Sequence, residues 1–152
     1  MFEPPRRQVA KNERIVRPGL VGKNLPEPDK ETDALAHAVI GAAIEVHREL
    51  GPGYLESVYH EALAVEMSLR KIPFVKKPDV HVEYKGVAVG GGELDFLVGA
   101  LLVVELKAVE ELAPVHSAQV ISYLKSSGRK VGLLINFNVP VLKDGIKRVI
   151  RS

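Results

Sequence analysis

The hydrophobic pattern of this chain changes its period at Pro73. Before that residue, apolar side chains recur every three or four positions, which predicts helices over residues 32–50 and 55–71, separated by Gly51-Pro52-Gly53. After it, apolar and polar residues alternate with a period of two over residues 80–84, which predicts a strand. A chain that combines both periods is expected to pack helices against a sheet.

The second half of the chain predicts more strands and one more helix. Three segments have the apolar content of strands: residues 93–98, 101–107 and 131–136. Gly90-Gly91-Gly92 is expected to interrupt the sheet before them, and a third helix begins at Pro114 and reaches about Ser127. Residues 139–150 fit a short helix or an edge strand. The predicted fold class is α/β, with helices flanking a mixed sheet.

Residues 1–30 differ from the rest of the chain in composition. They contain five of the ten prolines and carry seven Lys/Arg against four Asp/Glu, a net charge of +3. The remaining residues carry fourteen Lys/Arg and fifteen Asp/Glu, a net charge of −1. We therefore predict a flexible tail over residues 1–30 and one folded domain over residues 31–152. Because the folded part is not basic overall, a nucleic-acid partner would need a local basic patch.

The absence of cysteine excludes several classes of site. Without Cys the chain has no disulfides, thiol nucleophiles, Cys-based zinc sites or iron–sulfur clusters. The longest uncharged apolar stretch, residues 96–104, is too short to span a bilayer, and no apolar run follows the basic residues near the N-terminus. We expect a cytoplasmic protein with no membrane partner.

Charged residues interrupt and end the most apolar part of the predicted sheet. Glu105 and Lys107 lie two positions apart on one strand, so their side chains share a face. Asp95 lies within the apolar run of residues 94–97, where a carboxylate is costly unless it is paired or binds a metal. Two carboxylates at a strand end, with a lysine beside them, suit Mg²⁺ or Mn²⁺. The alternatives are an ion pair between Glu105 and Lys107 and a bend capped by Asp95.

The register of the hairpin between these strands decides whether the two carboxylates meet. A two-residue turn would place Asp95 opposite Val104, on the face that Glu105 does not share. A three-residue loop over residues 99–101 instead places Asp95 directly opposite Glu105, with Cβ atoms roughly 5 Å apart. A shared metal site needs the second arrangement, so we predict an odd-numbered loop or a bulge.

Two predicted helices supply further polar side chains. Glu56, in the first turn of the second helix, suits the helix dipole and is also placed to hold a metal-bound water opposite Asp95. His116, Gln119 and Tyr123 share one face of the third helix. Such a stripe is commonly exposed to solvent, but this helix follows the strand with the paired charges. We therefore predict that Gln119 and Tyr123 face the carboxylates. Four other histidines lack metal-ligand spacing: His37, His47, His60 and His81.

Several of these segments resemble the motifs of one family. Gly53-Tyr54-Leu55-Glu56-Ser57-Val58-Tyr59 resembles the signature of the GxxExxY family. The later motifs of that family are similar to four parts of this chain: Asp95 and residues 105–109, 114–125 and 133–137. The resemblance covers residue 34 to the end of the chain. It implies the PD-(D/E)XK nuclease superfamily, whose fold is a restriction-endonuclease-like mixed central sheet flanked by helices.

The resemblance also implies roles for individual residues. Asp95 and Glu105 would bind the metal, with Glu56 as the carboxylate from the helix and Lys107 as the catalytic lysine. Gln119 and Tyr123 resemble the Q-x-x-x-Y helix of the RecB-like branch. The leading hypothesis is a nuclease that uses Mg²⁺ or Mn²⁺ to hydrolyse phosphodiester bonds in nucleic acid, with DNA favoured over RNA. The alternatives are a non-catalytic module that binds nucleic acid or protein on the same scaffold, and a structural cluster of ion pairs.

Overall fold

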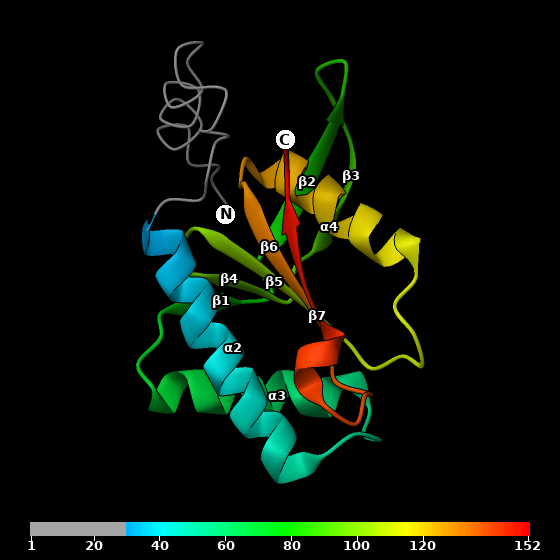
Figure 1. The fold of residues 1–152 in the computed structure, drawn as a ribbon. Coiled ribbons are helices and arrows are strands. Elements are labelled where there is room, and N and C mark those ends of the chain that lie inside the picture. Colours follow the sequence, from blue (N-terminus) through cyan, green and yellow to red (C-terminus); the bar gives the residue numbers. More distant parts are fainter. Residues whose placement is uncertain (1–29) are drawn as a thin grey trace, which may run out of the picture.

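The computed structural model describes residues 30–152, so nearly all of the predicted tail lies outside the described part of the chain. Figure 1 shows helices and strands in the order that the change of period predicts. The helical elements are α2 (Lys30–Leu50), α3 (Glu56–Leu69), α4 (Pro114–Ser127) and the 3-10 helix η2 (Leu142–Gly145). The strands are β1 (Phe74–Lys76), β2 (Asp79–Tyr84), β3 (Val87–Glu93), β4 (Phe96–Val98), β5 (Leu102–Lys107), β6 (Val131–Asn136) and β7 (Ile146–Ile150).

Five strands form one mixed sheet in the order β1-β4-β5-β6-β7. The central neighbours β5 and β6 are parallel, and α4 is the crossover between them. All other neighbours in this sheet are antiparallel. The stretch 139–150, which fits either a helix or a strand in sequence, contains both η2 and β7. The predicted α/β class, a mixed sheet flanked by helices, is confirmed.

Side chains from the two faces of the sheet pack against different helices. Leu102, Val104 and Leu106 of β5 lie in the apolar cluster that includes α2 and α3. Val103 lies in the second cluster, which includes side chains of α4. The central strands are therefore covered on both faces, which explains why they read as continuous apolar runs. Glu105 follows the alternation of β5 and belongs to the face of Val103 and α4.

The first turn of α3 projects further from the core than its periodicity predicts. Tyr59, Leu63 and Met67 are fully buried, whereas Leu55 is 75% exposed and Val58 is 37% exposed. The apolar side chains at the beginning of the predicted helix 55–71 therefore do not belong to the core. The helix packs against the sheet only from Tyr59 on, which leaves its N-terminal turn at the surface.

The strands β2 and β3 form a separate two-stranded ribbon beside α4 (Figure 1). The expected interruption at residues 90–92 is wrong, because β3 continues through all three glycines. A Cβ at Gly91 would lie 2.1 Å from the Val80 carbonyl oxygen, so no side chain fits there. A Cβ at Gly92 would lie 3.1 Å from the Tyr123 hydroxyl. Gly91 thus lets β3 lie close against β2, and Gly92 lets the ribbon approach Tyr123 of α4.

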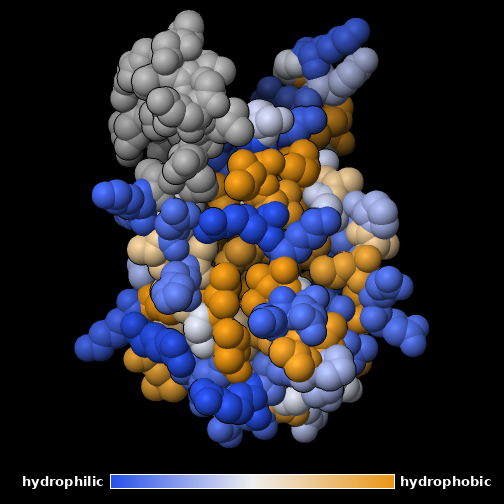
Figure 2. Space-filling model, viewed as in Figure 1, coloured by the Kyte–Doolittle hydropathy of each residue, from blue (hydrophilic) through white to orange (hydrophobic). Residues whose placement is uncertain are grey.

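The face that carries α2 and η2 has apolar side chains among charged ones (Figure 2). Ile44 of α2 and Val141, just before η2, are 42% and 54% exposed. Apolar atoms make up a large share of any folded surface, so these side chains do not by themselves mark a site. No helix within residues 30–152 has both the length and the apolar content needed to cross a membrane.

Candidate active site

The β4–β5 hairpin has the register that a shared carboxylate site requires. Val98 pairs with Leu102, so the connecting loop has three residues. Within this loop Ala100 adopts a left-handed conformation with φ 62°. The same register, continued by one residue beyond β4, places Asp95 opposite Glu105. The predicted three-residue loop is confirmed.

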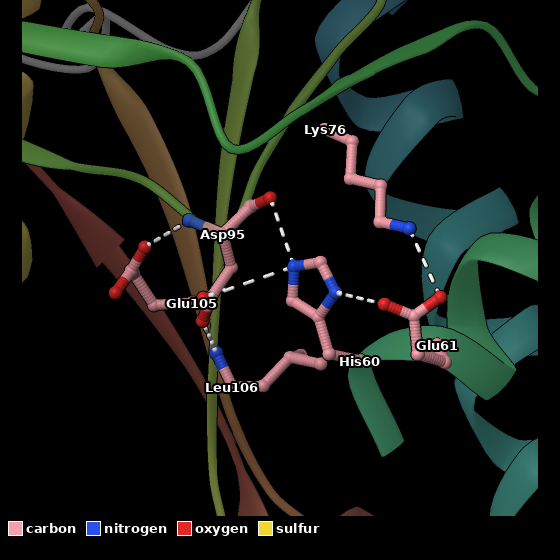
Figure 3. A network of polar contacts seen from close by, with 6 residues as sticks. All are labelled: His60, Glu61, Lys76, Asp95, Glu105 and Leu106. Atoms are coloured by element: carbon pink, nitrogen blue, oxygen red, sulfur yellow. Dashed lines mark hydrogen bonds and ion pairs between the residues drawn. The ribbon is translucent and has the colours of Figure 1, made fainter. Parts of the chain in front are cut away.

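Asp95 and Glu105 are locked together by reciprocal hydrogen bonds (Figure 3). The Asp95 N–H donates to Glu105 Oε1 at 2.7 Å, and the Leu106 N–H donates to Asp95 Oδ2 at 2.7 Å. Asp95 lies at a bend, as one alternative expected, but its carboxylate bonds across the hairpin and not to its own turn. Both carboxylates are therefore fixed at one end of the central strands.

Burial and the proximity of the Asp95 carboxyl raise the pKa of Glu105. Burial, followed by the negative charge of Asp95, raises the pKa of the Glu105 carboxyl to about 8. Burial also raises the pKa of Asp95, although the Leu106 N–H and the positive charges of His60 and Lys107 act in the opposite direction. Two carboxyls this close and this poorly hydrated resist being ionised together. A cation between them would remove that resistance.

Glu56 and Lys107 interact electrostatically with the carboxylates of Asp95 and Glu105. Glu56 begins α3 and Lys107 ends β5. The Glu56 side chain is exposed, yet partial burial and the charge of Asp95 raise its pKa, while the Lys107 ammonium lowers it. His116, in the first turn of α4, acts on Glu56 in the same direction as Lys107. The structure thus gathers charged groups from α3, β5, α4 and the residue before β4.

The helix α4 brings Tyr123 close to the carboxylates. Tyr123 is half-buried, and its pKa is raised by burial and then by the negative charge of Glu105. Gln119 is exposed, and its Nε2 donates a long hydrogen bond of 3.4 Å to the Tyr123 hydroxyl. Tyr123 therefore lies within electrostatic reach of the carboxylates, whereas Gln119 contacts Tyr123 and is exposed to solvent.

His60 is a member of this cluster that sequence reasoning missed. Its side chain is buried, and its ring stacks on Phe96 with centroids 4.3 Å apart. His60 Nε2 lies 3.2 Å from the Asp95 carbonyl oxygen and 3.9 Å from Asp95 Oδ1 (Figure 3). The available signal was its place one helical turn after Glu56, on the same face of α3. Metal-ligand spacing alone does not detect a histidine that contacts the backbone of Asp95.

The carboxylates fit a hard divalent cation that keeps much of its hydration. Within residues 30–152, no three acidic or histidine side chains are arranged so as to enclose a metal on their own. Mg²⁺ is usually held by one or two carboxylates, with water in the remaining positions. Asp95 and Glu105 each use one oxygen in the reciprocal backbone hydrogen bonds. The second oxygen of each carboxylate would then coordinate the cation.

Asn136 fixes the chain that leaves Lys107. Asn136 is buried, its Oδ1 accepts from the Val109 N–H at 3.0 Å, and its Nδ2 donates to the Val109 carbonyl at 2.9 Å. The Phe137 N–H also donates to the Lys107 carbonyl at 2.9 Å. These bonds hold the strand end that carries Lys107 against β6.

Replacing Asn136 with alanine is expected to lower the free energy of unfolding by about 2–4 kcal/mol, because the Val109 N–H and carbonyl lose their partner in a buried place. Urea denaturation followed by circular dichroism measures the change. Asn138→Ala is the matched control, because within residues 30–152 Asn138 forms its hydrogen bond through the backbone N–H and not through its side chain. It should change stability by less than about 0.5 kcal/mol. Equal effects of the two substitutions would contradict the role of the Asn136 amide.

Comparisons with known proteins concern the family and the fold of this chain. A family described as the PD-(D/E)XK nuclease superfamily matches residues 33–149, while no curated protein matches the chain. Among solved structures, SSO0001 is similar with a TM-score of 0.50 and 17% identity, over 80% of this chain and 58% of that one. This chain thus spans well under two thirds of the length of SSO0001.

An alkaline exonuclease (LHK-Exo) from Laribacter hongkongensis gives a TM-score of 0.47 and 12% identity, over 95% of this chain and 76% of that one. The similarity to SSO0001, at 17% identity, concerns the fold alone. The family match concerns the sequence itself: it spans residues 33–149, more than half of the chain, and this range includes Asp95, Glu105 and Lys107. The chain therefore belongs to the PD-(D/E)XK nuclease superfamily.

Proposed function

We propose that this protein is a nuclease that hydrolyses phosphodiester bonds in nucleic acid with the help of Mg²⁺ or Mn²⁺. The observation that carries the proposal is the interlocked pair of Asp95 and Glu105, with the Lys107 ammonium beside it. The pair would hold the cation. When bound, such a cation supplies Lewis acidity toward a phosphoryl oxygen and toward the attacking water. The similarity to the GxxExxY motifs supports placing the chain in that part of the superfamily.

The other residues of the cluster have roles that follow from their charge. Lys107 cannot bind a cation while it is charged, so it would stabilise the negative charge that develops on the phosphoryl group and orient the attacking water. Glu56, at the exposed edge of the cluster, would accept a hydrogen bond from that water or from the hydration shell of the cation. Tyr123 would donate its hydroxyl to a phosphate oxygen, with Gln119 bonded to the same hydroxyl.

Lysines near the carboxylates would provide the local basic patch that a nucleic-acid partner needs. Lys77 lowers the pKa of Asp95 through its charge, and Lys107 does so more strongly. Lys76, next in the chain to Lys77, pairs with Glu61 at 3.0 Å. The charges of Lys77 and Lys107 offset the net charge of −1 over residues 31–152 where a phosphate would approach, whereas the charge of Lys76 is balanced by Glu61. We favour DNA over RNA as the substrate.

Asp95→Asn is expected to weaken Mn²⁺ binding by at least about 100-fold, because the pair loses one of its two anionic ligands. Isothermal calorimetry measures the affinity. Cleavage of labelled single- and double-stranded DNA and of RNA in Mg²⁺ should be lost in parallel. Asp79→Asn is the matched control, because Asp79 is an exposed acid on β2. Equal Mn²⁺ affinity in wild type and Asp95→Asn would rule out this metal site.

A binding module without catalysis is the second candidate. It is favoured by the net charge of −1 over residues 31–152, and a nuclease fold does not by itself fix a catalytic function. The same experiments separate the two functions. Mn²⁺ or DNA binding without any cleavage in wild-type protein would support the binding module.

A further inference from the structure

We propose that His60 is a positioning residue that holds the backbone of Asp95 and thereby aims its carboxylate at the cation. This inference rests on the proposed function, because it takes Asp95 to be a metal ligand. It concerns a contact that His60 makes with the Asp95 carbonyl oxygen and not with the metal.

The Asp95 carbonyl oxygen accepts two hydrogen bonds from different elements. The Lys77 N–H donates to it at 2.9 Å, and His60 Nε2 lies 3.2 Å from it. The Asp95 N–H is bound to Glu105 on its other side. Because Asp95 lies at a bend outside the regular ladder, these contacts replace the strand pairing that would otherwise fix its backbone.

The geometry identifies the role of each ring nitrogen. A carbonyl oxygen only accepts, so the Nε2 of His60 must carry the hydrogen of this bond. The Nδ1 atom is buried and makes no hydrogen bond within the described part of the chain, and it lies 4.0 Å from Glu61 Oε2. With its hydrogen on Nε2, the ring has no free lone pair there to offer a metal. It therefore acts as a donor.

Packing alone does not explain a histidine at this position. His60 is only 4% exposed, and its ring lies nearly parallel to that of Phe96, at 15° between planes. A phenylalanine would make the same stacking contact without burying an unbonded nitrogen, and unbonded buried polar atoms are rare. The feature that only histidine adds is the hydrogen bond to Asp95.

The chain contains a matched histidine away from the site. His47 of α2 is also buried, and its Nε2 lies 2.8 Å from the Val139 carbonyl oxygen. Its ring lies 6.4 Å from that of Phe137, tilted by 35°. His47 therefore makes the same type of bond to a backbone carbonyl but none to the carboxylates, which makes it a control for general effects on stability.

The test compares His60→Phe, His60→Gln and His47→Phe with the wild-type chain. Residues that orient a metal ligand typically change metal affinity or activity by 10- to 100-fold. We expect His60→Phe to weaken Mn²⁺ binding, measured by calorimetry, by roughly that factor. It should lower kcat on a DNA substrate without raising KM. His60→Gln, whose amide can place a donor near the position of Nε2, should recover most of the Mn²⁺ affinity. His47→Phe should leave Mn²⁺ affinity unchanged.

The outcomes separate this inference from the proposed function. Wild-type protein without Mn²⁺ binding would overturn both. Wild-type binding together with equal affinity in His60→Phe, or with no recovery in His60→Gln, would overturn the positioning role alone. If His60→Phe is too unstable to purify, the comparison of His60→Gln with His60→Asn decides. The shorter Asn amide does not reach the carbonyl, so equal Mn²⁺ affinity in these two variants would also overturn it.

Discussion

Replacing Lys107 with alanine is expected to slow phosphodiester hydrolysis by about 10²- to 10³-fold while changing Mn²⁺ affinity little. This loss of rate is the size expected when an enzyme loses one fixed group that stabilises the negative charge developing in the transition state. The Lys107 ammonium has two opposite effects on Mn²⁺ affinity. The Lys107 ammonium lowers the pKa of Asp95 and of Glu105, which favours their ionised forms, but it also repels a cation beside them. Single-turnover cleavage and calorimetry on the same protein measure the two effects.

Two variants make this experiment specific. Lys107→Arg keeps the positive charge on a larger group and should retain more activity than the alanine variant. Lys125→Ala removes an exposed lysine of α4 and should leave the rate unchanged. Full activity of Lys107→Ala would contradict the catalytic role. If Lys107→Ala lost the circular dichroism signal of the folded protein, the lysine would instead be needed to maintain the fold.

Elements with a clear period were predictable from the sequence. The third helix and the buried strand after it have the predicted bounds, 114–127 and 131–136, because each has a sharp start and stop signal and an apolar face. The strand β1 has only three residues, Phe74–Lys76, which is too few to show a period. The strand β3 runs through three glycines, although glycine has a low propensity for strands. The close packing that explains one of them, Gly91 against the Val80 carbonyl, is a tertiary contact that propensity does not show.

The candidate site was predictable where one chain segment determines its geometry. The pairing of Asp95 with Glu105 follows from the register of a single hairpin, and the register is the one that a shared cation requires. His60 was missed because its contact with Asp95 joins residues that are 35 positions apart and depends on how α3 packs. Such a tertiary contact leaves no trace in local spacing.

The metal-free protein is expected to become less stable as the pH rises from about 4.5 to about 8. In the folded chain Glu105 holds its proton up to a pKa of about 8, whereas its ordinary value is 4.5. Across this window the native state binds more protons than the unfolded state, so the free energy of unfolding falls with pH. The loss should be on the order of a few kcal/mol. The raised pKa of Asp95 acts in the same direction.

Glu105→Gln should largely remove this dependence, because an amide keeps the shape of the carboxyl but does not ionise. Urea denaturation in EDTA at several pH values is the measurement. The variant should be more stable than wild type at pH 8 and close to it at pH 4.5. An equally steep pH dependence in Glu105→Gln would show that the titration belongs to other groups. Glu93→Gln, an exposed acid at the end of β3, is the control and should leave the wild-type pH profile unchanged.

The same proton should be released when a cation binds. Below pH 8 the Glu105 carboxyl must lose its proton to become a ligand, so Mn²⁺ affinity should increase with pH until the carboxyl is ionised. Calorimetry in buffers of different ionisation enthalpy counts the protons released, and at pH 7 we expect a release of nearly one per Mn²⁺. In Glu105→Gln both the proton release and most of the affinity should disappear. Metal binding without proton release in wild-type protein would contradict this, because it would mean that the cation binds away from the buried pair.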